Sequence, residues 1–445
     1  MSEAVVTLKK GEGRSLKAGG SWVYDNEIAK IEGHFENGAI VRVEDFDGYG
    51  MGKGVINQNS VIRVRMLSRD KDCQIDASFW RARVSAAWDY RKSVLGGGNR
   101  LEDVMKLPNP GIGTTGNADL NACRVIFGEA DFIPGMVVDK YGDILVVESL
   151  SLGTDRLKKE ILAQLLEVMA KDGIKIREIY ERSDAPVRKK EGMQPFKGVI
   201  YPDGNTSPDN HQIEIMENGI RYLVDVQNGQ KTGFFLDQKY NRLSMQRICK
   251  QLAMRAGQEK VRVLDCFTHM GTFALNCGYA LREGGALPHL AEVTGLDISE
   301  YAVMQASENA RRNGLQEIVK FRAANVLDEL PRLNEAGERY DVVILDPPAF
   351  TKSREATKNA IKGYREINMK GMKLVKDGGF LATCSCSHFM TQELFTSTIA
   401  QAAKASHKRL RQVELRTQAS DHPILWAADE SYYLKFLIFQ VVEEK

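Results

Sequence analysis

The sequence predicts an α/β protein in which a doubly wound, mostly parallel sheet is preceded by a small β-barrel and a small α+β domain. Three observations support this prediction. Residues 1–72 contain short alternating segments separated by Gly-rich turns, residues 123–180 combine short strands with one helix, and strands and helices alternate from residue 261 onward. A chain of 445 residues is too long for one compact domain, so two or three domains are expected.

The overall composition is that of an ordinary globular protein, with 43% hydrophobic and 27% charged residues. Lys and Arg number 61 against 59 Asp and Glu, so the net charge of +2 neither requires nor excludes nucleic acid. No apolar run approaches the roughly 18 residues of a membrane span, and the polar start lacks the apolar core of a signal peptide. We therefore expect a cytoplasmic protein with no membrane partner.

The first predicted domain, residues 1–72, carries basic residues on a predicted strand. Arg63 and Arg65 project from one face of the segment VIRVRML, and Lys9, Lys10, Arg14 and Lys17 lie upstream. These cations suggest an RNA-contacting patch. A solvated strand face explains the same pattern equally well.

The second predicted domain, residues 73–190, begins with a linker helix over residues 76–92. Gly96–Gly98 and the Pro/Gly-rich stretch 108–116 then predict a linker, and residues 123–180 predict an α+β module. The basic cluster Arg188, Lys189 and Lys190 follows. Such clusters are usually solvated, and contact with an RNA substrate is the alternative.

The third predicted domain, residues 191–445, opens with a hairpin through Asn218-Gly219. Residues 231–235, KTGFF, form a loop suited to cover a flat ring. The alternating strands and helices that follow predict the parallel sheet. No crossover helix separates the segment VELRT from the last strand, YYLKFLIFQVV, so this strand is expected to be antiparallel.

The stretch from Val261 to Phe273 reads as a buried strand, a tight turn and a helix, which is how a nucleotide-like cofactor is commonly held. It lacks the G-x-G-x-x-G pattern of pyrophosphate sites. Polar residues follow the next strands. Asp297 suits two ribose hydroxyls, Asn325 suits an adenine edge, and Asp346 ends the fourth strand before two prolines.

With these strand ends in place, the sequence resembles the class I S-adenosylmethionine-dependent methyltransferases, and more narrowly the bacterial large-subunit rRNA cytosine-5 methyltransferase I family. The resemblance covers nearly the whole chain and is weakest from Val94 to Gly116. Its marks are GSWVYDNEI, FGEADFIPGMVVDKYG, ERSDAPVRKKEGM, QKTGFFLDQKYNR, LDCFTHMGTF, DPPAF, SCS and SDHP. It implies that the first domain is a PUA domain and the third a methyltransferase domain.

The resemblance also implies S-adenosylmethionine as cofactor and large-subunit rRNA as partner; a homodimer is left open. No metal is expected, because the C-x-C pair has no second cysteine or histidine cluster at metal-ligand spacing. The residues expected at the cofactor pocket are Lys231, Thr232, Gly233, Phe234, Phe235, Asp237, Gln238, Asp265, Phe267, Gly271, Thr272, Phe273, Asp297, Ile298, Asn325, Val326 and Asp346. Asn325 departs from the Asp of relatives, which replaces a charge with an amide.

The proposed chemistry requires a thiolate, because cytosine C5 is a poor nucleophile until a thiolate adds to C6. The seven cysteines are scattered, which argues against disulfides, but Cys384 and Cys386 form a C-x-C pair near the methyl donor. The alternation of residues along the predicted strand does not show which of the two cysteines is the nucleophile. The family's S-C-S matches Ser385-Cys386-Ser387, so Cys386 is the predicted nucleophile and Asp346 is predicted to hold the base edge.

Two other functions remain open at this stage. The same fold serves guanine N7 methylation, and D-P-P followed by an aromatic residue is similar to enzymes that methylate exocyclic amines, neither of which needs a thiol. An inactive RNA-binding ribosome-assembly protein is the second alternative, although the acids at the strand ends argue against it. His422 is expected either to face the pocket or to pack in the interior.

Overall fold

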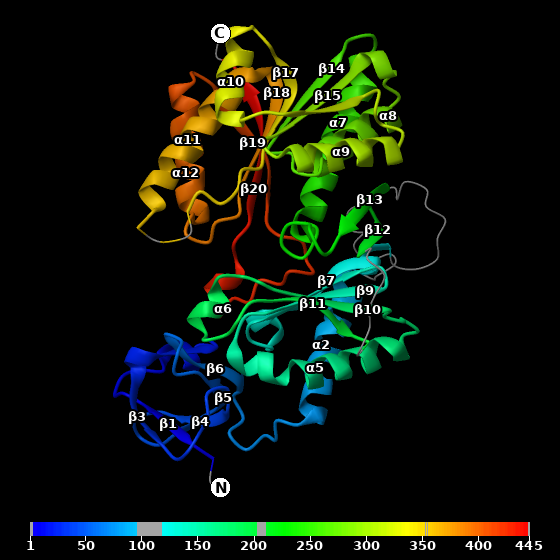
Figure 1. Cartoon of the computed structure of the whole chain (residues 1–445). Coiled ribbons are helices and arrows are strands. Elements are labelled where there is room, and N and C mark those ends of the chain that lie inside the picture. The colour runs from blue at the N-terminus through cyan, green and yellow to red at the C-terminus, as the bar shows by residue number, and fades with distance from the viewer. Residues whose placement is uncertain (1–2, 96–117, 203–210, 352, 354, 444–445) are drawn as a thin grey trace. The chain divides into compact units, whose positions relative to one another are not determined.

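The computed structural model describes residues 3–95, 118–202, 211–351, 353 and 355–443 (Figure 1). The linker predicted over Gly96–Gly98 and residues 108–116 lies outside these residues. The chain divides into two compact units. The first comprises Met1–Met216, Leu223–Leu236 and Ser420–Ser431, and the second comprises Glu217–Tyr222, Asp237–Ala419 and Tyr432–Lys445.

The first unit begins with a six-stranded sheet in the order β2-β6-β5-β4-β1-β3. Its strands are β1 (Val5–Leu8), β2 (Trp22–Tyr24), β3 (Ile28–Glu32), β4 (Ile40–Glu44), β5 (Gly50–Ile56) and β6 (Ile62–Ser68), with the short helix α1 (Arg14–Lys17). Alternating apolar residues such as Val41 and Val43 are fully buried in one core. The sequence therefore predicted this sheet correctly.

The central part of the first unit is a five-stranded sheet in the order β11-β10-β9-β8-β7. Its elements are α2 (Ala77–Leu95), α4 (Ala118–Asn121), β7 (Ala122–Phe127), β8 (Met136–Tyr141), β9 (Ile144–Ser149), α5 (Leu152–Lys171), β10 (Glu178–Ser183), α6 (Val187–Lys190) and β11 (Phe196–Tyr201). Trp80 and Trp88 of α2 are fully buried in its core. Because β11 pairs antiparallel with β10, the sheet extends past the boundary predicted at residue 190.

A two-stranded hairpin formed by β12 (Gln212–Glu217) and β13 (Ile220–Asp225) follows. Both turn residues have positive φ, 53° at Asn218 and 82° at Gly219. Asn and Gly are the residues that adopt this two-residue turn with least strain. The predicted hairpin is confirmed.

The second unit contains a seven-stranded sheet in the order β16-β15-β14-β17-β18-β20-β19. Its elements are α7 (Lys239–Ala256), β14 (Val261–Cys266), α8 (Thr272–Glu283), β15 (Ala291–Asp297), α9 (Glu300–Arg312), β16 (Val319–Ala323), α10 (Val326–Glu335), β17 (Tyr340–Leu345), α11 (Thr357–Leu374), β18 (Val375–Ser385), α12 (Gln392–Ala405), β19 (Arg409–Arg416) and β20 (Lys435–Val442). Helices α7, α8 and α9 lie on one side of this sheet, and α11 and α12 lie on the other (Figure 1).

The strand directions confirm the predicted sheet. Strands β16, β15, β14, β17 and β18 pair in parallel. Strand β20 is antiparallel to both β18 and β19, as expected from the missing crossover helix. Helix α11 ends at Leu374, and the irregular first part of β18 follows directly, with a φ of 79° at Gly378.

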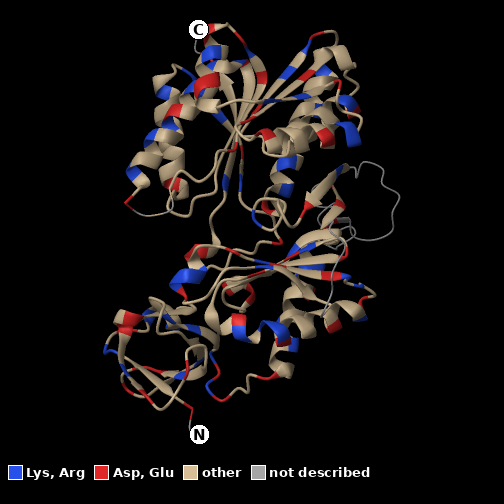
Figure 2. Ribbon diagram, in the orientation of Figure 1, with Lys and Arg blue, Asp and Glu red and all other residues tan. Residues whose placement is uncertain are grey.

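Charged residues of both signs are interspersed over each unit (Figure 2), in keeping with the net charge of +2. No helix among the described residues is both long and apolar enough to cross a membrane. One ion pair of the second unit is fully buried. Arg242 of α7 forms two hydrogen bonds, of 2.6 and 2.8 Å, to the carboxylate of Glu217.

Replacing Glu217 with Gln is expected to destabilise the second unit by about 3–5 kcal/mol, because the buried Arg242 guanidinium would lose its counter-charge. Calorimetric unfolding of the full chain measures this effect. The control is Glu308→Gln in the exposed Glu308–Arg311 pair, which should have a much smaller effect because solvent screens this pair. Equal effects of the two substitutions would contradict the prediction.

Candidate active site

The carboxyl ends of four neighbouring strands bring together the acids and the cysteine pair singled out in the sequence. Strand β14 ends at Asp265-Cys266, β15 ends at Asp297, Asp346 follows β17, and Cys386 follows β18. The strands are adjacent and parallel, so these ends lie along one edge of the sheet. In doubly wound sheets this edge is where ligands bind.

The turn after β14 has an unusual backbone. Phe267 and His269 have positive φ values, 63° and 52°, which non-glycine residues adopt only with strain. Gly271 has a φ of 84° and immediately precedes α8. A Cβ at Gly271 would lie 2.6 Å from the ring of Phe321, so no other residue fits. Strain held at a strand end is typical of a ligand-binding turn.

Asp265 is fully buried at the centre of this turn. Its Oδ2 accepts hydrogen bonds from Thr268 Oγ1 at 2.5 Å and from the Ala274 amide at 2.9 Å. Its Oδ1 is buried without a hydrogen-bond partner. Burial raises the pKa of Asp265 to about 7. An unpaired buried carboxylate oxygen is costly in isolation and is suited to a cationic ligand group such as an ammonium.

Asp297 is held in place at the neighbouring strand end. Its Oδ2 accepts from the His269 amide and its Oδ1 from the Ser299 amide, both at 2.9 Å. Each oxygen keeps a further lone pair, which suits hydroxyl donors. The next residue, Ile298, is 74% exposed and can contact a ligand.

Asn325 has a structural task that the sequence did not reveal. Its side chain caps α10 by accepting from the Leu327 amide at 3.1 Å and donates to Asp328 at 2.8 Å. Val326 is 2% exposed and belongs to the hydrophobic core, so its side chain is not part of an open pocket. Thr272 and Phe273 are also buried, and the Phe273 ring stacks on Phe436 with centroids 5.7 Å apart.

Asp346 forms a cluster with Gln238 and Cys384. Gln238 Nε2 lies 3.3 and 3.4 Å from the two Asp346 oxygens, and the Cys384 thiol donates to Oδ1 at 2.7 Å. Asn241 orients Gln238 by donating to its Oε1 at 2.6 Å. Asp237 is tied separately, since its carboxylate accepts from Tyr433 at 2.6 Å.

The two thiols of the C-x-C pair have different surroundings. Cys384 is fully buried, and burial together with the neighbouring Asp346 raises the pKa of its thiol well above the ordinary value. Cys386 is partly exposed beyond the end of β18. Ser385 lies between them and donates to the Tyr364 hydroxyl at 2.9 Å. Cys384 is therefore held as a neutral donor, whereas Cys386 is accessible to a reagent or substrate.

The loop KTGFF belongs to the first unit. Thr232 is fully buried and donates to Asp139 at 2.6 Å, and its hydroxyl lies 2.9 Å from that of Tyr141. Tyr141 also donates to the Phe234 carbonyl at 3.2 Å. Lys231 Nζ lies 4.5 Å from the centroid of the Phe235 ring, and Gly233 has a φ of 129°. The role of these five residues at the cofactor remains a prediction.

Two of the predicted RNA-contacting arginines have structural roles instead. Arg65 is 8% exposed and pairs with Glu191 at 2.9 Å and Glu129 at 3.4 Å. Arg188 is 4% exposed and donates to the Ser149 carbonyl at 2.6 Å and to Asp155 at 2.9 Å. The prediction of surface contacts was wrong for both, because carboxylates distant in sequence bury the guanidinium groups.

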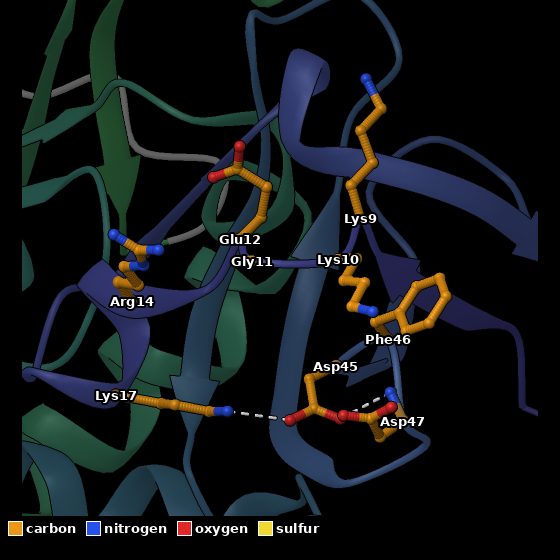
Figure 3. Close-up of a pocket in the computed structure, with 9 residues that line it drawn as sticks. All are labelled: Lys9, Lys10, Gly11, Glu12, Arg14, Lys17, Asp45, Phe46 and Asp47. Carbon is orange, nitrogen blue, oxygen red and sulfur yellow. Dashed lines mark hydrogen bonds and ion pairs between the residues drawn. The ribbon is translucent and has the colours of Figure 1, made fainter.

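The other predicted cations remain accessible. Lys189 and Lys190 are exposed on α6, and Arg63 is partly exposed, with Nη2 4.0 Å from Asp25. The upstream residues Lys9, Lys10, Arg14 and Lys17 surround a cavity of about 200 Å³ (Figure 3). Glu12, Asp45, Phe46 and Asp47 complete its lining, and Lys17 pairs with Asp45 at 2.9 Å. This cavity is therefore of mixed charge.

His422 packs in the interior of the first unit. It is 2% exposed, its Nδ1 lies 2.9 Å from Asp421 Oδ1, and its ring centroid is 5.6 Å from that of Phe127. Sequence reasoning missed Lys435, a buried lysine at the start of β20. A single cation within the apolar run YYLKFLIF was the signal that could have identified it.

Comparison with known proteins is consistent with this geometry. A family model for a PUA-like domain matches residues 6–69, and one for S-adenosylmethionine-dependent methyltransferases matches residues 205–439. Ribosomal RNA large subunit methyltransferase I of Alteromonas mediterranea is 34% identical and covers 99% of this chain and 100% of its own length. The protein of that name from Aeromonas salmonicida is 36% identical, with 97% and 98% covered.

Solved structures share the architecture. A proposed S-adenosylmethionine-dependent methyltransferase from Streptococcus mutans aligns with a TM-score of 0.72 at 18% identity, over 98% of this chain and 99% of that one. A proposed methyltransferase solved with S-adenosylhomocysteine aligns with a TM-score of 0.73 at 18% identity, over 99% and 100%. These matches confirm the fold predicted from the sequence.

If Asp265 accepts the ammonium of S-adenosylmethionine, binding requires its carboxylate form. With a pKa of about 7, the Kd is expected to rise about tenfold for each pH unit below 7. Asp265→Asn should weaken binding by about 10- to 100-fold and remove this pH dependence. Titration calorimetry between pH 5.5 and 7.5 tests this, with Glu308→Gln as the control. A constant wild-type Kd would contradict it.

Proposed function

Because this chain belongs to the family of S-adenosylmethionine-dependent ribosomal RNA large subunit methyltransferases I, we propose that it forms 5-methylcytosine in large-subunit rRNA through a covalent Cys386 adduct. The observation that carries this proposal is the partly exposed Cys386 at the same sheet edge as Asp265, Asp297 and Asp346. S-adenosylmethionine supplies an electrophilic methyl group when bound.

Cys386 would act as the nucleophile on the RNA base. Its thiolate adds to C6, and the electron pair of the C5–C6 double bond moves so that C5 becomes nucleophilic. After C5 has gained the methyl group, loss of the C5 proton restores the double bond and breaks the bond between sulfur and C6. The thiolate is thereby regenerated.

Accessibility favours Cys386 over Cys384. Cys384 is fully buried, and its thiol already donates to Asp346 at 2.7 Å, so a base cannot approach its sulfur without a rearrangement. Its raised pKa also disfavours the thiolate that the chemistry needs. Cys386, in contrast, is partly exposed.

Asp346 would hold the edge of the cytosine and favour protonation of the ring nitrogen, which makes C6 more electrophilic. Gln238 and Cys384 donate to its carboxylate and fix its direction, yet a carboxylate accepts more than two hydrogen bonds. In a double-stranded region the target base must be flipped out to reach this edge, and in a single-stranded region it is directly accessible.

The cofactor would be held along the same edge. Asp265 Oδ1 offers a partner for the ammonium, Asp297 offers its carboxylate to the ribose hydroxyls, and the Gly271 turn permits close approach of the backbone. The side-chain oxygen of Asn325 already accepts the hydrogen bond that caps α10. Asn325 would therefore contact the adenine through a hydrogen-bonding position of its amide that the cap does not use. Ile298 provides an apolar contact.

The alternative functions make different demands on these residues. Methylation of guanine N7 or of an exocyclic amine needs no thiol, so a partly exposed Cys386 at the same sheet edge as Asp346 would be without purpose. An inactive RNA-binding protein would have no need for the strained turn and the unpaired Asp265 oxygen. The geometry therefore favours the cytosine reaction over both.

Cys386→Ala is expected to reduce methyl transfer by on the order of 10³-fold or more while S-adenosylmethionine binding is retained. The assay follows transfer of labelled methyl groups to rRNA from a strain lacking the gene, with nucleoside mass spectrometry to identify base and atom. Cys266→Ala, at a buried cysteine of the cofactor turn, is the matched control and should retain most of the turnover.

RNA that contains 5-fluorocytosine should become covalently attached to the wild-type protein, since fluorine at C5 prevents the final elimination. The adduct should be absent in Cys386→Ala. Turnover by Cys386→Ala, or a product other than 5-methylcytosine, would refute the mechanism.

RNA binding is proposed to use the exposed cations Lys189 and Lys190, with Arg63. Replacing both lysines with Ala should weaken RNA binding and reduce the slope of log K against log salt by about 1–2. Filter binding at several salt concentrations measures this. The double variant Lys171→Ala and Lys175→Ala, which removes the same charge from exposed positions, should bind as the wild type does. Equal slopes for both variants would exclude α6 as a contact.

A further inference from the structure

Lys435, the first residue of β20, is a buried cation beside the proposed nucleophile. It is 1% exposed, and its backbone is the register partner of Ser385 on β18. Its Nζ donates to the carbonyl of Ser387 at 2.6 Å and to that of Tyr433 at 2.9 Å. The first of these hydrogen bonds holds the residue directly after Cys386.

The charge of Lys435 has no carboxylate counter-ion among the described residues. A buried ammonium normally pairs with Asp or Glu, since isolated burial of a charge is costly. Here the ionisable groups that act on Lys435 are the thiols of Cys386 and Cys384, with Cys386 the stronger of the two. The Cys384 thiol donates its proton to Asp346, and its pKa is raised well above the ordinary value, so it is not the thiol expected to carry a negative charge.

We propose that Lys435 is a positioning residue that stabilises the Cys386 thiolate electrostatically and, through the Ser387 carbonyl, fixes the backbone that carries it. This inference rests on the proposed role of Cys386 as the nucleophile. Formation of the Cys386 thiolate releases one proton. The thiol gives its proton to solvent, the ammonium keeps its own, and no further reactant is needed.

Two tyrosines lie near the Lys435–Ser385 pair of β20 and β18. The Tyr432 ring lies 5.8 Å from Nζ, and the Tyr364 hydroxyl accepts a hydrogen bond from Ser385, the register partner of Lys435. Burial lowers the pKa of Lys435 to about 8, and the two thiols oppose this shift. The lysine is therefore still mainly protonated at neutral pH, where a thiolate is needed, and loses its charge as the pH rises through 8.

The test measures the reactivity of Cys386 without RNA or cofactor. The full-length wild-type protein and its Lys435→Met variant are alkylated with iodoacetamide from pH 5.5 to 9.5, and each cysteine is quantified by mass spectrometry. The midpoint pH for Cys386 is expected to be at least about one unit higher in Lys435→Met, which makes alkylation at pH 7 about tenfold slower. Lys435→Arg should restore most of the shift.

The controls separate charge from structure. Lys408 directly precedes β19, at the end of the β19–β20 pair that is remote from Lys435. Lys408→Met should leave the pH profile of Cys386 alkylation unchanged. Cys73, in the first unit, is the internal reference in every sample. Identical Cys386 profiles in wild type and Lys435→Met would overturn the inference. If Lys435→Met does not fold, the wild-type protein alone provides the test. A midpoint pH of alkylation for Cys386 that is no lower than that for Cys73 would then also overturn the inference.

The outcomes distinguish this inference from the proposed function. Loss of methyl transfer in Cys386→Ala together with unchanged alkylation in Lys435→Met would reject the role of Lys435 alone. Retained methyl transfer in Cys386→Ala would reject the covalent mechanism, whatever the alkylation profile. In the expected case, Lys435→Met also lowers kcat with little change in the KM for RNA, and its activity recovers partly at high pH.

Discussion

The parallel pairing of β15, β14, β17 and β18 is the constraint on which the site depends. Adjacent parallel strands end on the same side, so residues up to about 120 positions apart in sequence, such as Asp265 and Cys386, are brought to one edge. The reversal at β20 then adds a residue that parallel topology could not supply. Because β20 is antiparallel to β18, its first residue, Lys435, lies beside the last residue of β18.

The two halves of this edge differ in their electrostatics. At β14 a buried carboxylate oxygen of Asp265 lacks a partner, and burial raises the pKa of that group to about 7. At β17 the carboxylate of Asp346 receives hydrogen bonds from Gln238 and Cys384. The Asp265 carboxylate is suited to a cation, whereas the Asp346 carboxylate is already oriented by its hydrogen bonds. A donor that carries an ammonium and a neutral acceptor base match these two environments respectively.

The sequence was sufficient to predict most of the fold, because hydrophobic periodicity and turn residues are local properties. Strand ends with acids could be predicted for the same reason. The burial of charged side chains could not be predicted from the sequence. Arg65 and Arg188 looked like surface cations until the structure placed Glu191 and Asp155 against them, and these pairings join residues 126 and 33 positions apart. Strand β11 was missed because it follows a basic cluster that resembled a domain boundary.

The C-x-C pair shows why residue type and spacing alone do not assign a nucleophile. The two cysteines are two residues apart in the sequence, and the structure distinguishes them by burial. Cys384 lies within the β18 ladder, where burial and Asp346 keep its proton in place, and its value there is as a hydrogen-bond donor to that acid. Cys386 lies past the ladder and is partly exposed, and the buried Lys435 ammonium donates to the carbonyl of the next residue, Ser387. In the proposed mechanism, two residues of displacement along the chain are thus enough to separate an orienting thiol from a reactive one.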